Sequence, residues 1–318
     1  MTNTLSAPQD PSTFTPGWLE ELERNAVRFT REAGAILLSH FQTALTIEYK
    51  GGAQRDPVTE VDKASEALLR DSIRAAYPTH SILGEEGDAD YVGEQPDFLW
   101  ALDPLDGTVN YINGLPFFAV SVGVLYRGEP IVGAIYMPAS GFLQQGVFHA
   151  RRGSPAYFEE FPIAVAPQPL PQASRISGLP AGWPRMIKFG GPLQRTPGEV
   201  RALGSIAVEM ALTACGTMQY AAFNRAKLWD VAAGVLIVKQ AGGLALTQDA
   251  RNKPWYPVQH FTPPKGEGPS GYRQWSNALI VGNPEIAWSV ATNLHRPVRI
   301  MRSVQQFVNK IKPGGRSQ

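Results

Sequence analysis

The sequence predicts an α+β fold, in which helices and a mainly antiparallel sheet occupy separate stretches of the chain. Two stretches near the N-terminus, about 17–46 and 58–77, have apolar residues at helical spacing. They are followed by short apolar runs that are typical of strands and lie at 98–102, 117–126, 130–137 and 142–150. Because the turn Arg127-Gly-Glu-Pro130 joins two of these runs directly, we expect antiparallel pairing rather than an alternating βαβ pattern.

The bulk composition excludes several classes of protein. With 318 residues the chain is long enough for two lobes and a large core. The net charge of +1, from 29 basic and 28 acidic residues, does not favour nucleic acid or a membrane as partner. Cys215 is the single cysteine, which excludes an intramolecular disulfide and fits a cytoplasmic location. No apolar stretch is long and charge-free enough to span a bilayer.

Composition also divides the chain into parts. Residues 1–16 are rich in Thr, Ser and Pro and lack the apolar core of a secretion signal, so we expect a flexible leader. Prolines between about 160 and 197 separate an N-terminal α+β lobe, 17–160, from a C-terminal α/β lobe, 161–295. The tail, 296–318, is basic without an acidic residue and is either a partner contact or a solvated end.

The first predicted helix, from Gly17 to about Thr46, serves packing. Residues 47–50 resemble a short strand, and the polar, glycine-rich loop 51–57 can move over a site. Lys50 at the edge of this loop is therefore a candidate site residue, although a lone lysine beside a loop is usually solvated.

The second predicted helix opens at Val58 to Asp62 and runs to about Tyr77. Thr59 fits the N-cap, with Asp62 three residues later in the arrangement of a capping box. The helix dipole favours an acidic residue in the first turn, so Asp62 by itself does not require a metal role.

Two adjacent carboxylates, Glu85 and Glu86, follow the strand-like run 81–84. Adjacent residues on an extended chain point to opposite sides, so one could bind a metal while the other holds a water. The alternative is an exposed acidic turn, since Asp88 and Asp90 follow directly.

The strongest signal is the pair Asp103 and Asp106, which lies at the end of an apolar strand. Pro104 has no N–H and is expected to stop the strand there. Two half-buried carboxylates that lie close together need a cation or protons between them. Gly107 lets the backbone approach an anion, and Thr108 places a hydroxyl and an amide at a helix start. This combination indicates Mg²⁺ and a phosphate, although the same residue types occur in ordinary turns.

The second half supplies three further predictions. A helix starts at Gly204 with Ser205 as its cap, and its amides can meet an anion or sugar hydroxyls. Another helix opens on Asp230 as N-cap and closes on the glycines at 242 and 243, with closing strands at 244–247 and 278–282. The segment 251–276, rich in aromatics, prolines and glycines, is either a lid or a surface excursion packed by its own aromatics.

Three motifs in this order resemble those of the inositol monophosphatase family of Mg²⁺-dependent, lithium-sensitive phosphatases: Gly84-Glu-Glu86, Asp103-Pro-Leu-Asp-Gly-Thr108 and Trp229-Asp-Val-Ala-Ala-Gly234. The segments Thr59 to Asp62, Gly242-Gly243 and Ala278 to Asn283 extend the resemblance over roughly residues 20–295. It implies a layered αβαβα sandwich of the inositol monophosphatase and fructose-1,6-bisphosphatase type, and a homodimer.

The resemblance also implies roles for single residues. The metal ligands would be Glu85, Asp103, the Leu105 carbonyl, Asp106 and Asp230, with Asp62 at a weaker third site. Glu86 and Thr108 resemble the pair that orients the attacking water, and with Asp106 they form the catalytic set. The amides of Gly107 and Thr108 would receive the phosphate, and Lys50 resembles the lysine of a mobile loop.

The chemistry of these residues agrees with the resemblance. A phosphate ester can be hydrolysed by in-line attack of a metal-activated water, without a covalent nucleophile. Carboxylates and carbonyls suit two or three Mg²⁺ ions, and the chain offers no His/Cys cluster for zinc. We expect a phosphomonoesterase whose partner is a small phosphorylated metabolite, a polyol or sugar-like phosphate.

One position departs from the family pattern. In inositol-selective members a glutamate seven residues before the last aspartate contacts the substrate hydroxyls, and here that position is Phe223. Gly204, Ser205 and Ile206 are the other candidate substrate contacts. The alternatives are a 3′(2′),5′-bisphosphate nucleotidase, a histidinol-phosphatase, a fructose-1,6-bisphosphatase, or a catalytically silent member that acts as a binding protein.

Overall fold

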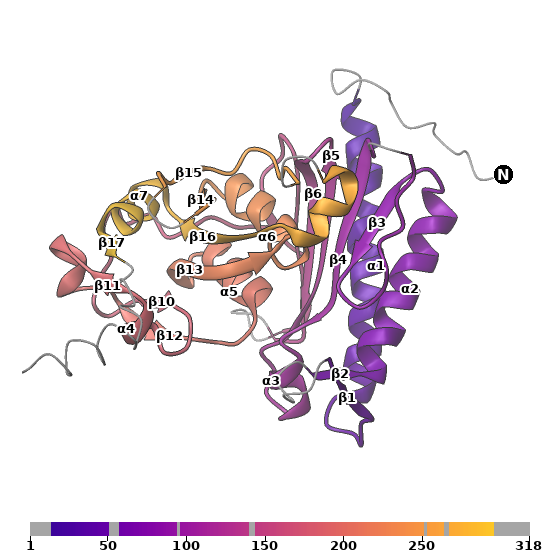
Figure 1. Cartoon of the computed structure of the whole chain (residues 1–318), viewed down its shortest axis with the longest axis horizontal. Helices are drawn as coiled ribbons and strands as arrows, with labels where there is room; N and C mark the ends of the chain where they lie inside the picture. Colours follow the sequence, from indigo (N-terminus) through magenta and orange to yellow (C-terminus); the bar gives the residue numbers. More distant parts are fainter. Residues whose placement is uncertain are drawn as a thin grey trace, which may run out of the picture.

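The computed structural model describes residues 14–50, 57–93, 96–139, 144–250, 253–263 and 267–295. Its helices and sheets form alternating layers, as Figure 1 shows. On one side α1 (Pro16–His40) and α2 (Glu60–Ala76) cover the first sheet; α5 (Ile206–Ala214) and α6 (Leu228–Gln240) lie between the two sheets; α7 (Pro284–Asn293) covers the second sheet. The expected αβαβα sandwich is confirmed.

The described strands of the first sheet have the order β3-β4-β5-β6-β7-β8-β9. Their bounds are β3 (Ser81–Gly84), β4 (Phe98–Asp106), β5 (Ala119–Tyr126), β6 (Glu129–Met137), β7 (Gly146–Arg151), β8 (Tyr157–Phe158) and β9 (Phe161–Pro162). β3 runs parallel to β4, whereas the later pairs are antiparallel. In the parallel pair Gly84 lies opposite Leu102, so both strands end at the same edge of the sheet. This edge positions the acidic residues.

The described strands of the second sheet have the order β12-β10-β13-β16-β14-β15. Their bounds are β10 (Ile176–Gly178), β12 (Glu199–Arg201), β13 (Met218–Lys227), β14 (Leu244–Gln248), β15 (Tyr256–Pro257) and β16 (Ser276–Gly282). Smaller elements complete the described fold: β1 (Ile47–Tyr49) with β2 (Pro57–Thr59), β11 (Lys188–Phe189) with β17 (Leu294–His295), the short helices α3 (Thr108–Ile112) and α4 (Trp183–Met186), and the 3₁₀ helices η2 (Gly191–Gln194) and η3 (Gly268–Gln274).

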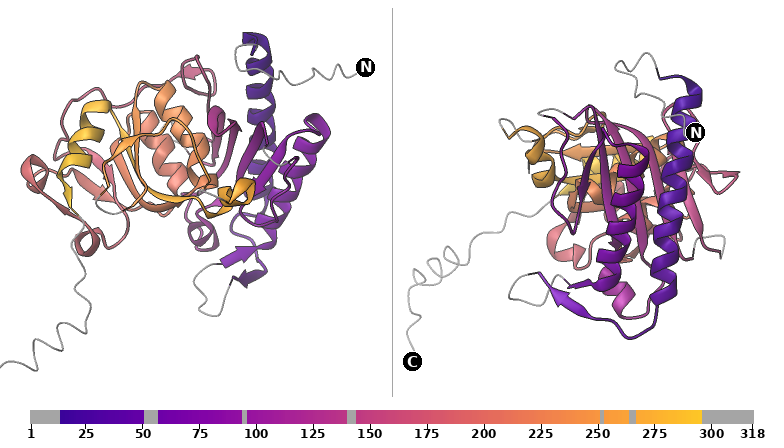
Figure 2. Two further views of the ribbon diagram at one scale, coloured as in Figure 1. Left: turned by 45° about the horizontal axis from the view of Figure 1, so that its top comes forward. Right: turned by 90° about the vertical axis from the view of Figure 1, so that its right-hand side faces the viewer.

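Each interface between layers has its own apolar cluster. Figure 2 shows α1 and α2 side by side over the first sheet. On α1 the fully buried apolar residues recur every three or four positions and are Leu22, Ala26, Phe29, Ala33 and Leu37. The central cluster surrounds α5 and α6, which are buried on nearly all sides. The core therefore holds these two helices firmly between the sheets.

Two predicted boundaries were wrong. α1 ends at His40 rather than near Thr46, because the extended Phe41 packs its ring against Tyr111 and Phe118. The start of α2 agrees with the prediction, since the helix begins at Glu60 directly after its N-cap Thr59, while residues 57–59 also pair with β1 as a strand.

The second wrong boundary is Pro104, which does not end its strand. β4 continues to Asp106, where the ladder to β5 resumes with Asp106 opposite Ala119 after an irregular step from Asp103. A bulge takes up the proline, which cannot donate a ladder hydrogen bond.

Some predictions lie outside the described residues. These are the leader at 1–13, the loop at 51–56, the start of the strand expected at Phe142, the parts 251–252 and 264–266 of the aromatic segment, and the tail at 296–318. Among the described residues, no helix has both the length and the apolar character needed to cross a membrane.

Candidate active site

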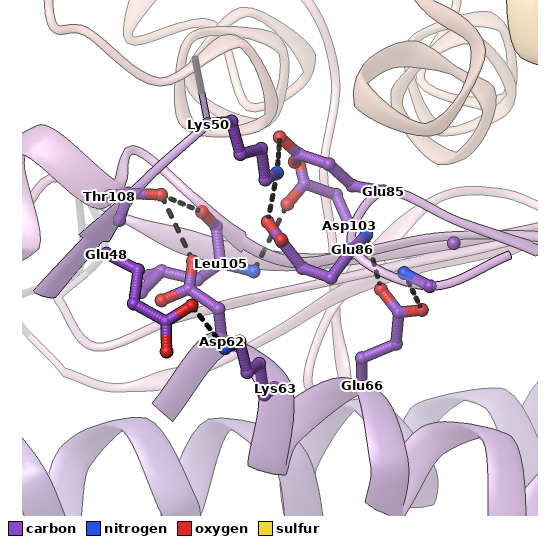
Figure 3. A network of polar contacts seen from close by, with 12 residues as sticks. Glu48, Lys50, Asp62, Lys63, Glu66, Glu85, Glu86, Asp103, Leu105 and Thr108 are labelled. Carbon is purple, nitrogen blue, oxygen red and sulfur yellow. Dashed lines mark hydrogen bonds and ion pairs between the residues drawn. The ribbon is translucent and has the colours of Figure 1, made fainter. Parts of the chain in front are cut away.

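Glu85 and Asp103 are neighbours because β3 and β4 are parallel. The Glu85 amide continues the ladder by donating to the Leu102 carbonyl at 3.1 Å. Asp103 is 2% exposed, and its Oδ1 accepts a hydrogen bond of 3.1 Å from the Leu105 amide. Figure 3 shows these side chains together at the end of the sheet. The predicted proximity of the acidic residues is confirmed on the first sheet.

Asp106 connects the first sheet to the helix α5. Its Oδ2 accepts hydrogen bonds from the Ser205 hydroxyl at 2.9 Å and the Ala207 amide at 2.5 Å. The predicted cap is confirmed, since Ser205 Oγ also accepts from the Val208 amide at 3.2 Å. Ser205, which we predicted as a substrate contact, thus directs its hydroxyl to Asp106. Ile206 is the first residue of α5.

Asp230 comes from α6, between the two sheets. The helix begins at Leu228, so Asp230 is its third residue and not its N-cap, as the sequence had suggested. Its Oδ2 accepts a hydrogen bond of 2.8 Å from the Lys227 amide. The negative charges of Asp106 and Glu85 both raise the pKa of Asp230. Asp230, on α6, therefore lies near acidic residues that belong to the first sheet.

Burial raises the pKa of all four carboxyl groups. Burial together with the neighbouring charges raises the pKa of Glu85 to about 7, whereas burial alone raises that of Asp106 to about 6. Burial, followed by the neighbouring carboxylates, holds the pKa of Asp103 and of Asp230 well above the usual range. Negative charge on these groups is therefore unfavourable unless a positive charge lies beside them.

The donor chemistry fits a hard divalent cation, because it consists of carboxylate and carbonyl oxygens. Among the described residues, however, no three acidic, histidine or cysteine side chains converge as a ready-made ion site. The neighbouring carboxylates nevertheless raise the pKa of Asp103 and of Asp230, so a positive charge among them would be favourable. The carboxylate and carbonyl oxygens present here therefore fit Mg²⁺, the cation that the resemblance implies.

Lys50 supplies a positive charge to the cluster. Its Nζ lies 2.7 Å from Glu86 Oε1 and 3.4 Å from Glu85 Oε1. The ammonium group opposes the rise that burial causes in the pKa of both glutamates. Lys50 is thus in contact with the site rather than solvated beside a loop, and the two glutamates approach the same cation.

Asp62 both caps the helix α2 and contacts the candidate site, the two roles that the sequence left open. Its Oδ2 accepts hydrogen bonds from the amide and hydroxyl of Thr59, at 2.8 and 2.5 Å, so the capping box is confirmed. Its Oδ1 lies 3.3 Å from the Thr108 hydroxyl, which is also 3.1 Å from the Leu105 carbonyl. Burial raises the pKa of Asp62. The cap and the site therefore share one carboxylate.

The turn at Gly107 requires a glycine. Its φ is 95°, and a Cβ would lie 2.8 Å from the Phe117 carbonyl oxygen. Thr108 follows as the first residue of α3. The side-chain Nδ2 of Asn110 donates at 2.6 Å to the carbonyls of Phe117 and Leu203, which links this turn to the loop that contains Gly204.

Glu66, which we did not single out from the sequence, supports the Glu85-Glu86 turn. Its carboxylate accepts hydrogen bonds of 2.8 Å from the amides of Glu86 and Gly87, and one of 2.7 Å from Arg70 Nε. The spacing of Glu66 and Arg70 on α2 indicates a helical ion pair. Nothing in that spacing, however, predicts contact with a turn twenty residues away.

Phe223 is only 7% exposed and packs in the central apolar cluster. The pairing of β13 with β16 is irregular between Phe223 and Ala226, and the two residues between them, Asn224 and Arg225, are exposed. The position at which the resemblance implies a glutamate in inositol-selective members is thus occupied here by a buried apolar side chain.

In its described part, the segment 253–276 packs around its own aromatic side chains. Phe261, Tyr272 and Trp275 are buried, and the rings of Phe261 and Trp275 meet edge-on at 4.9 Å. The segment also lines two cavities of about 450 and 510 Å³, away from the carboxylates. These contacts favour the interpretation as a packed excursion.

Comparisons with known proteins agree with this geometry. The model of the inositol monophosphatase family matches residues 18–277. Nus factor SuhB of Salmonella typhimurium is 32% identical over 85% of this chain and 94% of its own length. Inositol-1-monophosphatase of Bacillus subtilis is 33% identical over 71% of this chain and 85% of its own. The structure of an Anabaena inositol monophosphatase is 27% identical, covers 91% of this chain and 96% of that one, and has a TM-score of 0.63.

Proposed function

This chain belongs to the inositol monophosphatase family, and we propose that it is a Mg²⁺-dependent phosphomonoesterase that hydrolyses a small polyol or sugar-like phosphate. The observation that carries the proposal is the group of four carboxylates, Glu85, Asp103, Asp106 and Asp230, which come from two layers of the fold. Asp103 is buried and the other three are partly buried, and burial raises the pKa of all four. Such a group is unfavourable without a cation, and no packing requirement explains it.

In this proposal the four carboxylates, the Leu105 carbonyl and, at a weaker site, Asp62 hold two or three Mg²⁺ ions. When bound, Mg²⁺ supplies the positive charge that polarises the phosphate and lowers the pKa of the attacking water. Glu86 and Thr108 orient that water, and the amides of Gly107 and Thr108 receive the phosphate oxygens. Lys50 pairs with Glu86 and Glu85 and supplies a positive charge beside the residues that would hold the ions.

The identity of the alcohol is the finer part of the proposal. A buried phenylalanine, Phe223, stands where inositol-selective members have a glutamate. Its ring cannot accept a hydrogen bond, so the acceptor that would select myo-inositol is missing at this position. We therefore expect activity towards several small phosphates, with contacts from Gly204, Ser205 and Ile206. Bacillus subtilis inositol-1-monophosphatase and a Thermotoga maritima protein named fructose-1,6-bisphosphatase/inositol-1-monophosphatase are relatives whose names support this range.

A substrate panel tests the proposal. The full chain is assayed with Mg²⁺ on inositol 1-phosphate, glucitol 6-phosphate, histidinol phosphate, fructose 1,6-bisphosphate and phosphoadenosine phosphate. We expect turnover of at least one monoester, with inhibition by EDTA and lithium, and less than a tenfold preference for inositol 1-phosphate over glucitol 6-phosphate. Absence of turnover throughout the panel would contradict the proposal.

Mg²⁺ should also change how stability depends on pH. Burial raises the folded-state pKa of Glu85 from 4.5 to about 7 and of Asp106 from 3.8 to about 6. Without a cation the folded protein holds these protons more tightly than the unfolded chain, so stability falls as pH rises from about 4 to about 7. At pH 7.5, Mg²⁺ at about 100 times its Kd should raise Tm by about 5 °C, and the rise should be smaller at pH 5.

Glu209 provides the control for this experiment. Burial raises its pKa to about 7, but its carboxylate accepts from the Leu203 amide, at 2.7 Å, outside the proposed ligand set. Glu209→Gln should weaken the pH dependence without changing the Mg²⁺-induced rise in Tm, as measured by thermal unfolding. Equal Tm values with and without Mg²⁺ at pH 7.5 would count against metal binding.

A second candidate is a binding role without catalysis. It is favoured by the relatives named Nus factor SuhB, which the chain matches over 94% of their length. Isothermal titration separates the two candidates, since a silent member is expected to show no saturable Mg²⁺ binding. A homodimer and a cytoplasmic location remain predictions, which sedimentation and cell fractionation would test.

A further inference from the structure

Arg273 touches both parts of the molecule that supply the carboxylates. Its guanidinium donates hydrogen bonds to the carbonyl oxygen of Gly84, at 3.1 Å, and to that of Gly87. These carbonyls stand on either side of Glu85 and Glu86. The same guanidinium lies 5.6 Å from the ring centroid of Trp229, the residue before Asp230. One side chain thus joins the turn after β3 to the first turn of α6.

The turn that Arg273 contacts is held from two sides. On the side of α2, Glu66 accepts the amides of Glu86 and Gly87 at 2.8 Å. On the other side, Arg273 donates hydrogen bonds to the carbonyl oxygens of Gly84 and Gly87 in the same turn. A planar guanidinium presents several donors in a fixed fork, so it can bind two carbonyls at once and limit rotation of the peptide groups between them.

Arg273 itself is held in place by its surroundings. It lies in η3, within a segment that leaves the second sheet after β15 and returns to it at β16. The Phe261 amide donates at 2.8 Å to the carbonyl of Gly128, in the turn between β5 and β6. Tyr272 and Trp275, which flank Arg273, are each buried. In Figure 1 this gold segment runs from the second sheet to the first.

We propose that Arg273 is a positioning residue that sets the Glu85 turn against Asp230, so that carboxylates of two layers reach one Mg²⁺ cluster. Mg²⁺ demands near-ideal geometry, and a small displacement of one ligand weakens binding. The segment 253–276 is therefore a brace between the layers rather than a lid. This inference rests on the proposed function in taking Mg²⁺ as the ion.

The test is Mg²⁺ binding without substrate, measured by isothermal titration of the full chain. Arg273→Ala should raise the Kd for Mg²⁺ by about tenfold, in the range found when residues that orient metal ligands are removed. Arg273→Lys keeps the charge but lacks the planar fork, so it should restore only part of the affinity. In the phosphatase assay, kcat at subsaturating Mg²⁺ should fall while KM for the phosphate stays within about twofold.

Arg74→Ala is the matched control. Arg74 donates two hydrogen bonds to the Asp90 carboxylate, at 2.9 and 3.1 Å. Asp90 follows the turn that Arg273 contacts, but it lies beyond Gly87 and its carboxylate is exposed. This variant should bind Mg²⁺ like the wild type.

Stability is measured in EDTA for all variants. A fall in Tm for Arg273→Ala with a Kd within twofold of the wild type would overturn the proposal, because it would show a purely structural role. If Arg273→Ala does not fold, an unchanged Kd for Arg273→Lys overturns it equally.

The wild type separates this inference from the proposed function. If it binds Mg²⁺ but hydrolyses none of the phosphates, the proposed function fails and the comparison of Kd values still decides the role of Arg273. If it binds no Mg²⁺, both fail.

Discussion

Asp103→Asn should lower kcat/KM by about 10³-fold or more while the protein remains folded. Asp103 is 2% exposed, and neighbouring acidic groups act on it from both layers. Asparagine keeps the shape but removes the charge that would hold the cation in the proposed function, and loss of several kcal/mol of transition-state stabilisation corresponds to this factor. Phosphate release under saturating Mg²⁺ measures the effect.

Stability should change in the opposite direction. Burial and the neighbouring carboxylates keep the pKa of Asp103 well above the usual range, so the charged form is unfavourable at neutral pH. In EDTA, Asp103→Asn is therefore expected to have a Tm equal to or above that of the wild type. Asp97→Asn, which alters an exposed aspartate paired with Arg127 at 2.7 Å, should leave activity unchanged. Retained activity in the Asp103 variant would contradict the assignment.

Glu66→Ala should have the largest effect on stability, a loss of about 3–5 kcal/mol in the free energy of unfolding. The substitution leaves the backbone amides of Glu86 and Gly87 and the Nε of Arg70 without their acceptor, while Nη2 of Arg70 keeps its bond to the Asp88 carbonyl. Because the freed turn carries Glu85, Mg²⁺ binding should weaken as well. Urea unfolding, with and without Mg²⁺, measures both effects.

Glu48→Ala is the matched control for this prediction. Glu48 pairs with Lys63 at 2.7 Å, with both side chains at least half exposed, as seen at the edge of Figure 3. Exposed pairs of this kind contribute about 1 kcal/mol at most. A Glu66 variant that is no less stable than the Glu48 variant would show that the turn is held by other contacts.

Several features follow from local sequence and were predicted correctly. Thr59 and Ser205 cap their helices because their side-chain oxygens accept the free amides of the first turn. The hairpin at Arg127 and Gly128 has positive φ at both residues, 48° and 86°, as a tight two-residue turn requires. The acidic pair at 85–86 directly follows the buried strand β3, as the apolar run before it predicted, whereas the role of the acidic motifs at a metal site stays a prediction.

Local rules failed where distant residues compete with them. α1 ends at His40 because Phe41 gains more from packing on Tyr111 and Phe118 than from another helical turn. β4 passes Pro104 because β5 pairs again at Asp106. In both places a tertiary contact outweighs a preference of the backbone.

The sequence by itself was enough to propose the chemistry of this protein, because carboxylates, a glycine turn and a threonine retain their character wherever the chain places them. Only the tertiary structure decided how that site is held. Glu66 supports a turn 20 residues away, and Arg273 reaches Gly84 across 189 positions of sequence. Neither contact leaves a local pattern, since hydrogen bonds to backbone carbonyls and amides place no demand on the residue types at the other end.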